Sequence, residues 1–308
     1  MAVVSDPIRV SVVLPFLDAS HFMRECIDAV IAQTYPHWEL VLVDDGSRDD
    51  STAIAQEYVR RFPGRMRYLE HPGHENRGIS ASRNVGVREA RGEFIAELDA
   101  DDVWLPDKLA RLVPELEAHP DVGMVYGNSL YWYSWTGEPA DAARDHLPVM
   151  EPTDGPSNGS EVLFRQLRAK TASPCPCAVL LRKSVVERVG GSEEQFWGTH
   201  EDIVLYAKML IDSPVIVLDG WWDRYRCYAS PGTSVTEIAK KKGTLVDTHK
   251  RYLRWLERYL VERGMADSAH CQLVRTSLLR LRFPRTHRLV DVGRRALHRL
   301  NAMLGAST

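Results

Sequence analysis

The chain has 308 residues, of which 44% are hydrophobic and 26% are charged, and these fractions are ordinary for a soluble globular protein. No window approaches eighteen consecutive apolar residues, and the first residues lack the charged leader and apolar core of a signal peptide. We therefore expect neither a membrane-spanning helix nor secretion. The formal net charge of −3 hides an asymmetry, because residues 240–308 hold 16 Lys and Arg against 5 Asp and Glu. This predicts an acidic body, residues 1–235, followed by a basic C-terminal region, residues 236–308.

Five cysteines, an odd number, are scattered along the chain. Two of them lie in the segment SPCPCA, whose spacing is neither that of a zinc site nor that of a thioredoxin motif. We therefore expect reduced thiols and a cytoplasmic protein.

Strand and helix patterns alternate along the first hundred residues. Short runs rich in β-branched and other apolar side chains predict strands at 9–15, 38–43, 66–69 and 94–98. Apolar periodicity predicts helices at 21–33 and 51–62 and a third helix that ends near Ala90. Asp18, Ala19 and Ser20 offer N-cap chemistry for the first of these helices. The order predicts a parallel, doubly wound sheet, in which ligands lie at the carboxyl ends of the strands.

The rest of the chain continues with mixed patterns. They predict helices at 108–118 and 184–189, a helix after the segment GTHED, a loop at 137–160, and strands at 122–126, 178–182 and 215–218. Three helical patterns follow at 244–263, 268–281 and 286–304. The aromatic segment 131–135 and Trp197 would suit a planar or sugar ligand, and packing in the core is the alternative.

Three carboxylates, Asp99, Asp101 and Asp102, follow the predicted strand at 94–98. Carboxylates this close repel one another, and a fold that clusters them at a strand end usually brings a cation there. Mg²⁺ and Mn²⁺ favour such oxygen ligands and commonly share a site with phosphates. The segment therefore predicts a site for a metal and a diphosphate; the alternative is a solvated acidic turn that caps a helix begun by Trp104. Neither GxGxxG nor GxxxxGK[ST] occurs, which excludes the dinucleotide and P-loop ways of holding phosphate.

Several motifs follow one another along the chain. They read VSVVLPFLDAS, VLVDDGSRDDS, SRN, RGEFIAELDADDVWLPDKL, GTHEDIVLYAKM and RYRCYASPGTS. Together they resemble the motifs of family 2 glycosyltransferases over roughly residues 8–235. The resemblance implies the GT-A fold, a Rossmann-like, doubly wound and mostly parallel α/β sheet, here with a C-terminal helical appendage. It also implies an inverting transfer of a sugar from a nucleotide diphosphate donor, with a UDP-sugar as the expected donor and Mn²⁺ or Mg²⁺ as the cofactor.

The resemblance also implies which residues bind the donor. The implied set is Pro15, Phe16, Asp18, Asp45, Arg77, Arg83, Asp99, Ala100, Asp101 and Arg226. In this set, Asp45 suits uracil because a carboxylate accepts the N3–H of the base. Asp99 would face the sugar or ribose, and Asp101 would hold the metal, which neutralises charge on the leaving diphosphate. The arginines of the Gly-rich loop would contact base or phosphate, and Arg226 would take diphosphate charge.

Asp202 falls on the position of the family's catalytic base, with Glu201 beside it. An inverting transfer needs a base that removes the acceptor proton as the anomeric carbon is attacked. The alternative is that both carboxylates only cap a helix. His200 either contacts the acceptor or is an ordinary loop histidine.

Two positions depart from the family's pattern. Leu17 and Asp18 stand where many members carry a tyrosine that stacks on the base and an asparagine. Tyr228 stands where many members carry a histidine that binds the metal, and tyrosine is a poor Mn²⁺ ligand near neutral pH. The strength of metal dependence is therefore open.

Partners and competing functions also remain open. The basic tail either packs solvated helices against the body or attaches to anionic lipid, since LVDVGRRALHRLNAML alternates apolar and basic faces. Nucleic acid is not expected because this stretch lacks interleaved aromatic residues. The acceptor is unknown, and a homo-oligomer is an open alternative. Two other functions compete. One is a silent nucleotide-sugar-binding protein, which would not need Asp202. The other is a sugar-phosphate nucleotidyltransferase, which would need a Gly-rich basic loop after the first strand, and the segment PFLDAS is not such a loop.

Overall fold

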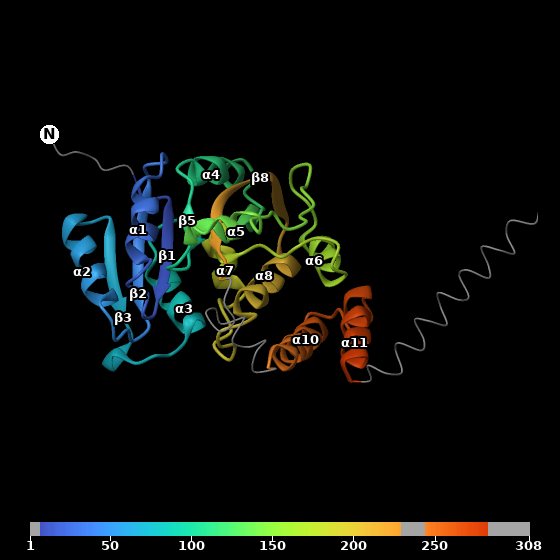
Figure 1. Cartoon of the computed structure of the whole chain (residues 1–308). Coiled ribbons are helices and arrows are strands. Elements are labelled where there is room, and N and C mark those ends of the chain that lie inside the picture. Colours follow the sequence, from blue (N-terminus) through green and yellow to red (C-terminus); the bar gives the residue numbers. More distant parts are fainter. Residues whose placement is uncertain (1–6, 229–243, 283–308) are drawn as a thin grey trace, which may run out of the picture. The chain divides into compact units, whose positions relative to one another are not determined.

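A computed structural model describes residues 7–228 and 244–282 of the chain (Figure 1). The chain divides into two compact units, residues 1–245 and 246–308. The boundary that the charge asymmetry predicts near residue 236 lies between 229 and 243, outside the described residues.

The described part of the first unit contains one eight-stranded sheet with the order β3-β2-β1-β4-β7-β6-β8-β5. The strands are β1 (Val10–Phe16), β2 (Trp38–Asp44), β3 (Met66–Glu70), β4 (Phe94–Glu97), β5 (Val103–Trp104), β6 (Met124–Trp132), β7 (Val179–Arg182) and β8 (Val215–Arg226). Strands β1 to β4 pair in parallel, as the alternation of strands and helices predicts, and β6 pairs in parallel with β8. The pairs β4–β7, β6–β7 and β5–β8 are antiparallel. The sheet is thus mixed and mostly parallel.

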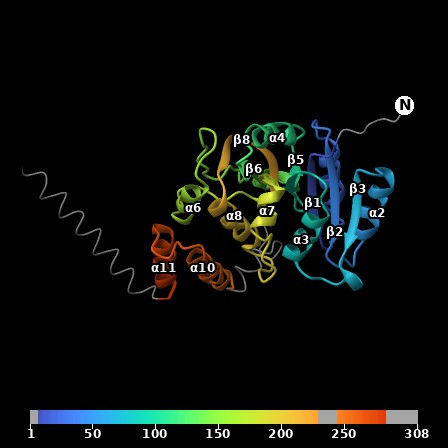
Figure 2. The same cartoon turned by 180° about the vertical axis from the view of Figure 1, so that it is seen from behind.

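Helices cover both faces of this sheet, which Figure 2 shows from behind. The described helices of the first unit are α1 (Met23–Ile31), α2 (Ser51–Arg61), α3 (Ile79–Glu89), α4 (Lys108–Ala118), α5 (Pro139–Ala142), α6 (Gly159–Leu167), α7 (Lys183–Arg188) and α8 (Glu201–Asp212). Alternate residues of β1 point to opposite layers because side chains alternate along a strand. Val12 and Leu14 join the core formed with α1, α2 and α4. Val13 faces α3, where Gly86 lies so close that a Cβ would clash with Val13 Cγ1.

The register of the central strands brings three loops to one edge of the sheet. Pro15 pairs with Val43 and Phe16 with Asp44 at the ends of β1 and β2. The N–H of Leu98, just after β4, donates to the Val13 carbonyl at 3.1 Å. The residues that follow these strands therefore lie side by side, as expected for the carboxyl ends of parallel strands.

Several local predictions are wrong or incomplete. The N-cap of α1 is Phe22, without a side-chain hydrogen bond, whereas the Asp18 carboxylate accepts the Arg48 N–H at 2.6 Å instead. No helix begins at Trp104, because Val103–Trp104 forms β5 against β8 and α4 begins at Lys108. Strands β6 and β8 extend well beyond the predicted 122–126 and 215–218 because they pair with each other through their aromatic halves. Helix α6 begins inside the predicted loop at 137–160, with the Asn158 side chain as its cap.

The described part of the second unit contains α10 (Leu245–Glu262), which begins on the last residue of the first unit, and α11 (Ala269–Arg282). Their buried side chains include Trp255, Leu256 and Val274, and Arg275 pairs with Glu257 at 2.8 Å. Two of the three predicted tail helices are thus present, and the third, at 286–304, lies outside the described residues. Among the described helices, none is long and apolar enough to cross a membrane.

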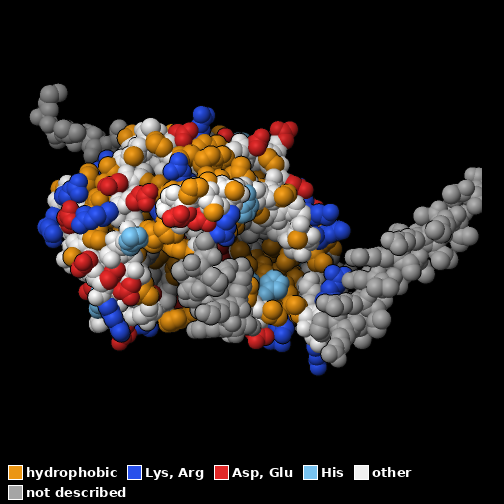
Figure 3. All heavy atoms as spheres, in the orientation of Figure 1, with side chains coloured by type: hydrophobic (Ala, Val, Ile, Leu, Met, Phe, Trp, Pro, Cys, Tyr) orange, Lys and Arg blue, Asp and Glu red, His pale blue; other side chains and the backbone are white. Residues whose placement is uncertain are grey.

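Acidic and basic side chains are interspersed over the first unit on the face drawn in Figure 3. The described residues of that face therefore present no extended basic patch of the kind that binds nucleic acid.

Candidate active site

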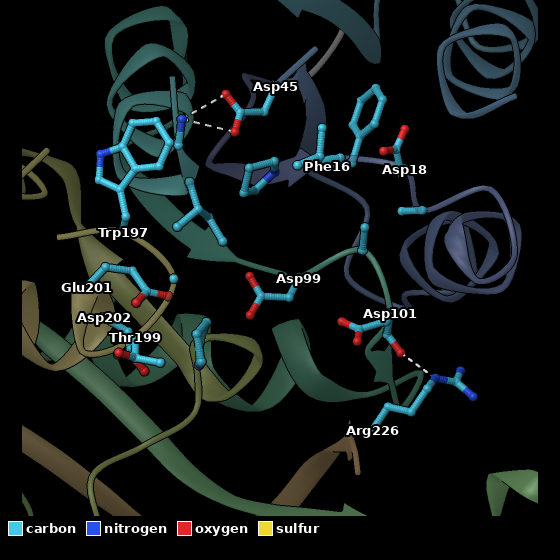
Figure 4. A pocket seen from close by; sticks show the side chains of 18 of the residues that line it. Phe16, Asp18, Asp45, Asp99, Asp101, Trp197, Thr199, Glu201, Asp202 and Arg226 are labelled. Atoms are coloured by element: carbon cyan, nitrogen blue, oxygen red, sulfur yellow. Dashed lines mark hydrogen bonds between the residues drawn. The ribbon is translucent and has the colours of Figure 1, made fainter. Parts of the chain in front are cut away.

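A cavity of about 870 Å³ opens at the edge of the sheet where β1, β2 and β4 end (Figure 4). Cavities of this size hold small-molecule ligands and cofactors. The predicted site residues that line it are Pro15, Phe16, Asp18, Asp45, Asp99, Ala100, Asp101, Glu201, Asp202 and Arg226. The structure therefore brings together ten predicted residues from distant parts of the sequence.

Two predicted donor-binding residues do not line the cavity. Arg77 is exposed, and its backbone N–H donates to Asp45 Oδ1 at 2.8 Å. Arg83 is buried in α3, with 1% of its surface exposed. Its guanidinium pairs with carboxylates of the site but does not itself line the cavity.

Asp45 lies at the end of β2 with 4% of its surface exposed. Its two oxygens accept the N–H of Gly78, each at 3.1 Å, where α3 begins. The turn that follows Asp45 needs glycine at position 46, because φ is +87° and a Cβ would lie 2.9 Å from the Asn76 nitrogen. Each carboxylate oxygen carries two lone pairs, so Asp45 can accept a further N–H from a ligand in the cavity. This is the contact that a nucleobase with a ring N–H would make.

Asp99 and Asp101 follow β4, and both face the cavity in Figure 4. Asp99 Oδ1 accepts from Arg83 at 2.8 Å, and Asp101 Oδ2 accepts from the hydroxyl of Tyr228 at 2.8 Å. Burial and the neighbouring Asp99 raise the pKa of Asp101. Asp102 instead points into the core, where its Oδ1 accepts the backbone N–H of Arg226 at 2.9 Å. Two of the three clustered carboxylates therefore serve the cavity, and the third anchors β8.

The residues present fit a hard divalent cation. Two carboxylates face one cavity, and carboxylate oxygens are the ligands that Mg²⁺ and Mn²⁺ favour. Within the described residues, no three His, Cys, Asp or Glu side chains have the geometry of a metal site. A cation here would therefore share its coordination with phosphate oxygens and water, as Mg²⁺ commonly does.

A buried charge network joins the two sides of the cavity. The guanidinium of Arg83 lies 2.8 Å from Asp99, 3.9 Å from Glu97 and 3.8 Å from Glu201. Tyr206 of α8 donates to Glu97 Oε2 at 2.7 Å. One guanidinium thus faces three carboxyl groups, and burial raises the pKa of Glu97.

Glu201 and Asp202 form the first turn of α8. Burial is the main cause that raises the pKa of Asp202, and burial and the neighbouring Asp202 raise the pKa of Glu201 to about 7. The helix N-terminus favours a carboxylate here, and the left-handed φ of 69° at His200 turns the chain into the helix. Asp202 thus lines the cavity in an environment that strengthens it as a base.

Arg226 and Tyr228, at the end of β8, hold the Asp101 segment. The Arg226 guanidinium donates to the Asp101 carbonyl at 2.6 Å and to Glu25 Oε2 at 2.7 Å. It lies against the rings of Phe22, Trp132 and Trp135, between 4.4 and 5.0 Å from their centroids. Part of the aromatic segment 131–135 therefore packs around this arginine. The roles of Phe22 and Glu25 were not predicted, because nothing local in α1 marks them as neighbours of β8.

The family model described as "Glycosyl transferase family 2" matches residues 11–190, more than half of the chain. The chain belongs to glycosyl transferase family 2. Among curated relatives of this family 2 chain, glycosyltransferase GlyA of Streptococcus pneumoniae is 34% identical over 122 residues, which cover 38% of this chain and 17% of GlyA. Glycosyltransferase GlyG of the same organism is 33% identical over 120 residues, which cover 39% of this chain and 38% of GlyG. The chain spans less than two fifths of the length of the first curated relatives that it matches.

Solved structures share the fold of this family 2 chain. S. aureus TarS 1-349 in complex with UDP-GlcNAc has a TM-score of 0.61 at 18% identity, over 90% of this chain and 73% of that one. The mannosyltransferase PcManGT from Pyrobaculum calidifontis, in complex with GDP-Man and Mn²⁺, has a TM-score of 0.56 at 19% identity, over 95% of this chain and 81% of that one. The predicted GT-A fold is confirmed.

Proposed function

We propose that this protein transfers a sugar from a nucleoside diphosphate, with UDP as the expected carrier, to an acceptor nucleophile with inversion at the anomeric carbon. The observation that carries the proposal is the single cavity that collects Asp45, the pair Asp99 and Asp101, and Asp202. These are a base-recognition carboxylate, a cation-binding pair and a candidate general base. The ligands named for TarS and PcManGT, UDP-GlcNAc and GDP-Man with Mn²⁺, support a nucleotide-sugar donor.

Asp45 would choose the nucleobase. A buried carboxylate accepts the N3–H of uracil, whereas cytosine presents an unprotonated N3 whose lone pair would face the carboxylate. Leaving a buried polar group unpaired lowers affinity severalfold or more. The site should therefore bind CDP more weakly than UDP, although cytosine and uracil are similar in size. Guanine also carries a ring N–H, so GDP is the competing carrier.

Asp101 and Asp99 would hold the Mn²⁺ or Mg²⁺ together with the donor's diphosphate, and this cation would neutralise charge on the departing UDP. Arg83 keeps Asp99 in place by a 2.8 Å contact, and Tyr228 keeps Asp101 in place by its hydroxyl. Since Tyr228 already occupies one oxygen of Asp101, we expect metal binding to depend strongly on the nucleotide.

Asp202 would act as the general base. The acceptor hydroxyl gives its proton to the Asp202 carboxylate as its oxygen bonds to the anomeric carbon, and the bond from that carbon to the diphosphate oxygen breaks. The leaving group and the base then lie on opposite sides of the sugar, which inverts the configuration. Burial, with a smaller contribution from the charge of Asp99, raises the pKa of Asp202 toward this task.

A thermal-shift panel tests the donor proposal without knowledge of the acceptor. A ligand that binds only the folded state stabilises it by an amount that rises with the logarithm of its affinity. We expect UDP with Mn²⁺ to raise the melting temperature more than CDP or ADP with Mn²⁺. Hydrolysis of a UDP-sugar by the same preparation would then distinguish an enzyme from a silent nucleotide-sugar-binding protein. Equal, negligible shifts for all nucleotides would contradict the proposal.

A further inference from the structure

Trp197 is a large aromatic side chain at the wall of the cavity, five residues before Asp202. It remains 59% exposed, which is unusual for an indole in a folded unit. Its Nε1–H donates to the Glu194 carbonyl at 3.1 Å, so the ring is held at its edge. In Figure 4 it lies at the same end of the cavity as Asp45 and away from Asp101. An exposed, fixed ring at a cavity wall is suited to stacking on a planar ligand.

One face of this indole rests on Gly78. A Cβ built on Gly78 would lie 3.2 Å from both Cδ2 and Cε2 of Trp197. These two atoms form the bond shared by the two rings, and an atom can approach both of them closely only from above or below the ring plane. Gly78 therefore supports one face of the indole, and any larger residue there would displace the ring.

The same glycine holds the base-recognition carboxylate, because the Gly78 N–H donates to both oxygens of Asp45 at 3.1 Å. The other aromatic residues of the cavity are placed differently, and Tyr225 packs against Tyr131 with ring centroids 5.3 Å apart. Phe16 is 3% exposed and belongs to the core. Phe22 and Tyr228 pack edge to face, 6.1 Å apart, and Tyr228 bonds to Asp101 at the opposite end. Among the described residues, Trp197 is thus the exposed ring that adjoins Asp45.

We propose that Trp197 stacks on the nucleobase of the donor while Asp45 accepts a ring N–H at the base's edge. This inference rests on the proposed function and names the residue that supplies affinity for the base. Stacking on an aromatic ring tolerates any base, since every base has a π-face. Asp45 selects among bases, and Trp197 contributes affinity for whichever base is bound.

Calorimetry with UDP, CDP and pyrophosphate, each with Mn²⁺, tests the inference on the full chain. Loss of one base–aromatic stack is worth roughly 5- to 150-fold in affinity, and we expect Trp197→Ala to weaken UDP by a factor in this range. Trp197→Phe, which keeps a ring, should stay within about threefold of the wild type. Pyrophosphate affinity should not change in either variant, because the diphosphate end is untouched. Leu147→Ala removes another exposed apolar side chain, outside the cavity, and should change none of the three affinities.

The outcomes separate the two proposals. If Trp197→Ala binds UDP within about twofold of the wild type, the stacking role is overturned while the donor site stands. If Trp197→Ala loses pyrophosphate as much as UDP, the effect is not at the base, and the stacking role is likewise overturned. If the wild type binds UDP no more tightly than pyrophosphate, no base is recognised and the proposed donor itself fails. A loss confined to UDP and CDP, with the Phe variant retained, supports the inference.

Discussion

Replacement of Arg83 by methionine should destabilise the fold, because the guanidinium is the buried partner of three carboxylates. Its side chain is 2% exposed and lies 2.8 Å from Asp99, 3.9 Å from Glu97 and 3.8 Å from Glu201. Removing one partner of a buried ion pair leaves an uncompensated charge and typically costs about 3–5 kcal/mol. Arg188→Met is the matched control, since Arg188 pairs with Asp212 at 2.6 Å but is 54% exposed. Exposed pairs contribute about 0–1 kcal/mol.

Urea denaturation followed by tryptophan fluorescence measures both variants, and its pH dependence tests the cause. Without the cation, the folded-state pKa values of Glu97 and Glu201, already raised by burial, rise further. The folded variant then binds protons more tightly than the folded wild type, so its deficit should grow as pH rises and shrink as pH falls. We expect a smaller deficit at pH 5.5 than at pH 7.5. An Arg83→Met protein as stable as Arg188→Met, or one whose deficit is larger at acidic pH, would refute this reasoning.

Two further changes test the cation pair and the layer packing. Asp101→Ala should bind UDP with an affinity that no longer responds to Mn²⁺ or to a chelator, because Asp101 is the proposed ligand; calorimetry that shows an unchanged Mn²⁺ effect would remove it from that role. Gly86→Ala should lower the free energy of unfolding by about 1–3 kcal/mol, because its Cβ would clash with Val13 Cγ1 between α3 and β1. The double variant Val13→Ala, Gly86→Ala should recover part of this loss, and additive losses would argue against the clash.

The first half of the sheet could be predicted because its signals are local. The β-branched runs of β1 and β2 lie between clear helix and turn signals, and these strands need only their neighbours in sequence to be recognised. Strand β8 could not be delimited in this way. Its second half, WWDRYR, mixes aromatic and charged side chains without a strict alternation, and it becomes a strand because Tyr225 and Arg226 pair with β6. Where the local sequence pattern is ambiguous, pairing with a distant strand determines how far β8 extends.

The same distinction applies to the site. Asp45, Asp99, Asp101 and Asp202 lie in recognisable motifs, and the structure gathers them in one cavity. The sequence does not reveal that Asp102 turns away from the cavity, because the N–H that holds it belongs to Arg226, 124 residues later. Nor does it reveal that Arg83 faces Glu201 across the fold. Such contacts depend on how α3, α8 and β8 pack, which no local pattern encodes.

Time-resolved NMR of a UDP-sugar turned over by the wild type and by Asp202→Asn tests the central claim most directly. The substitution is nearly isosteric and removes the proton-accepting charge, so UDP affinity should persist while the rate falls by about 10²–10⁴-fold, or roughly 3–5 kcal/mol of barrier. With water as the acceptor, the first sugar released by the wild type should carry the anomeric configuration opposite to that of the donor. A retained configuration, or an Asp202→Asn enzyme within about threefold of the wild-type rate, would contradict Asp202 as the base of an inverting transfer.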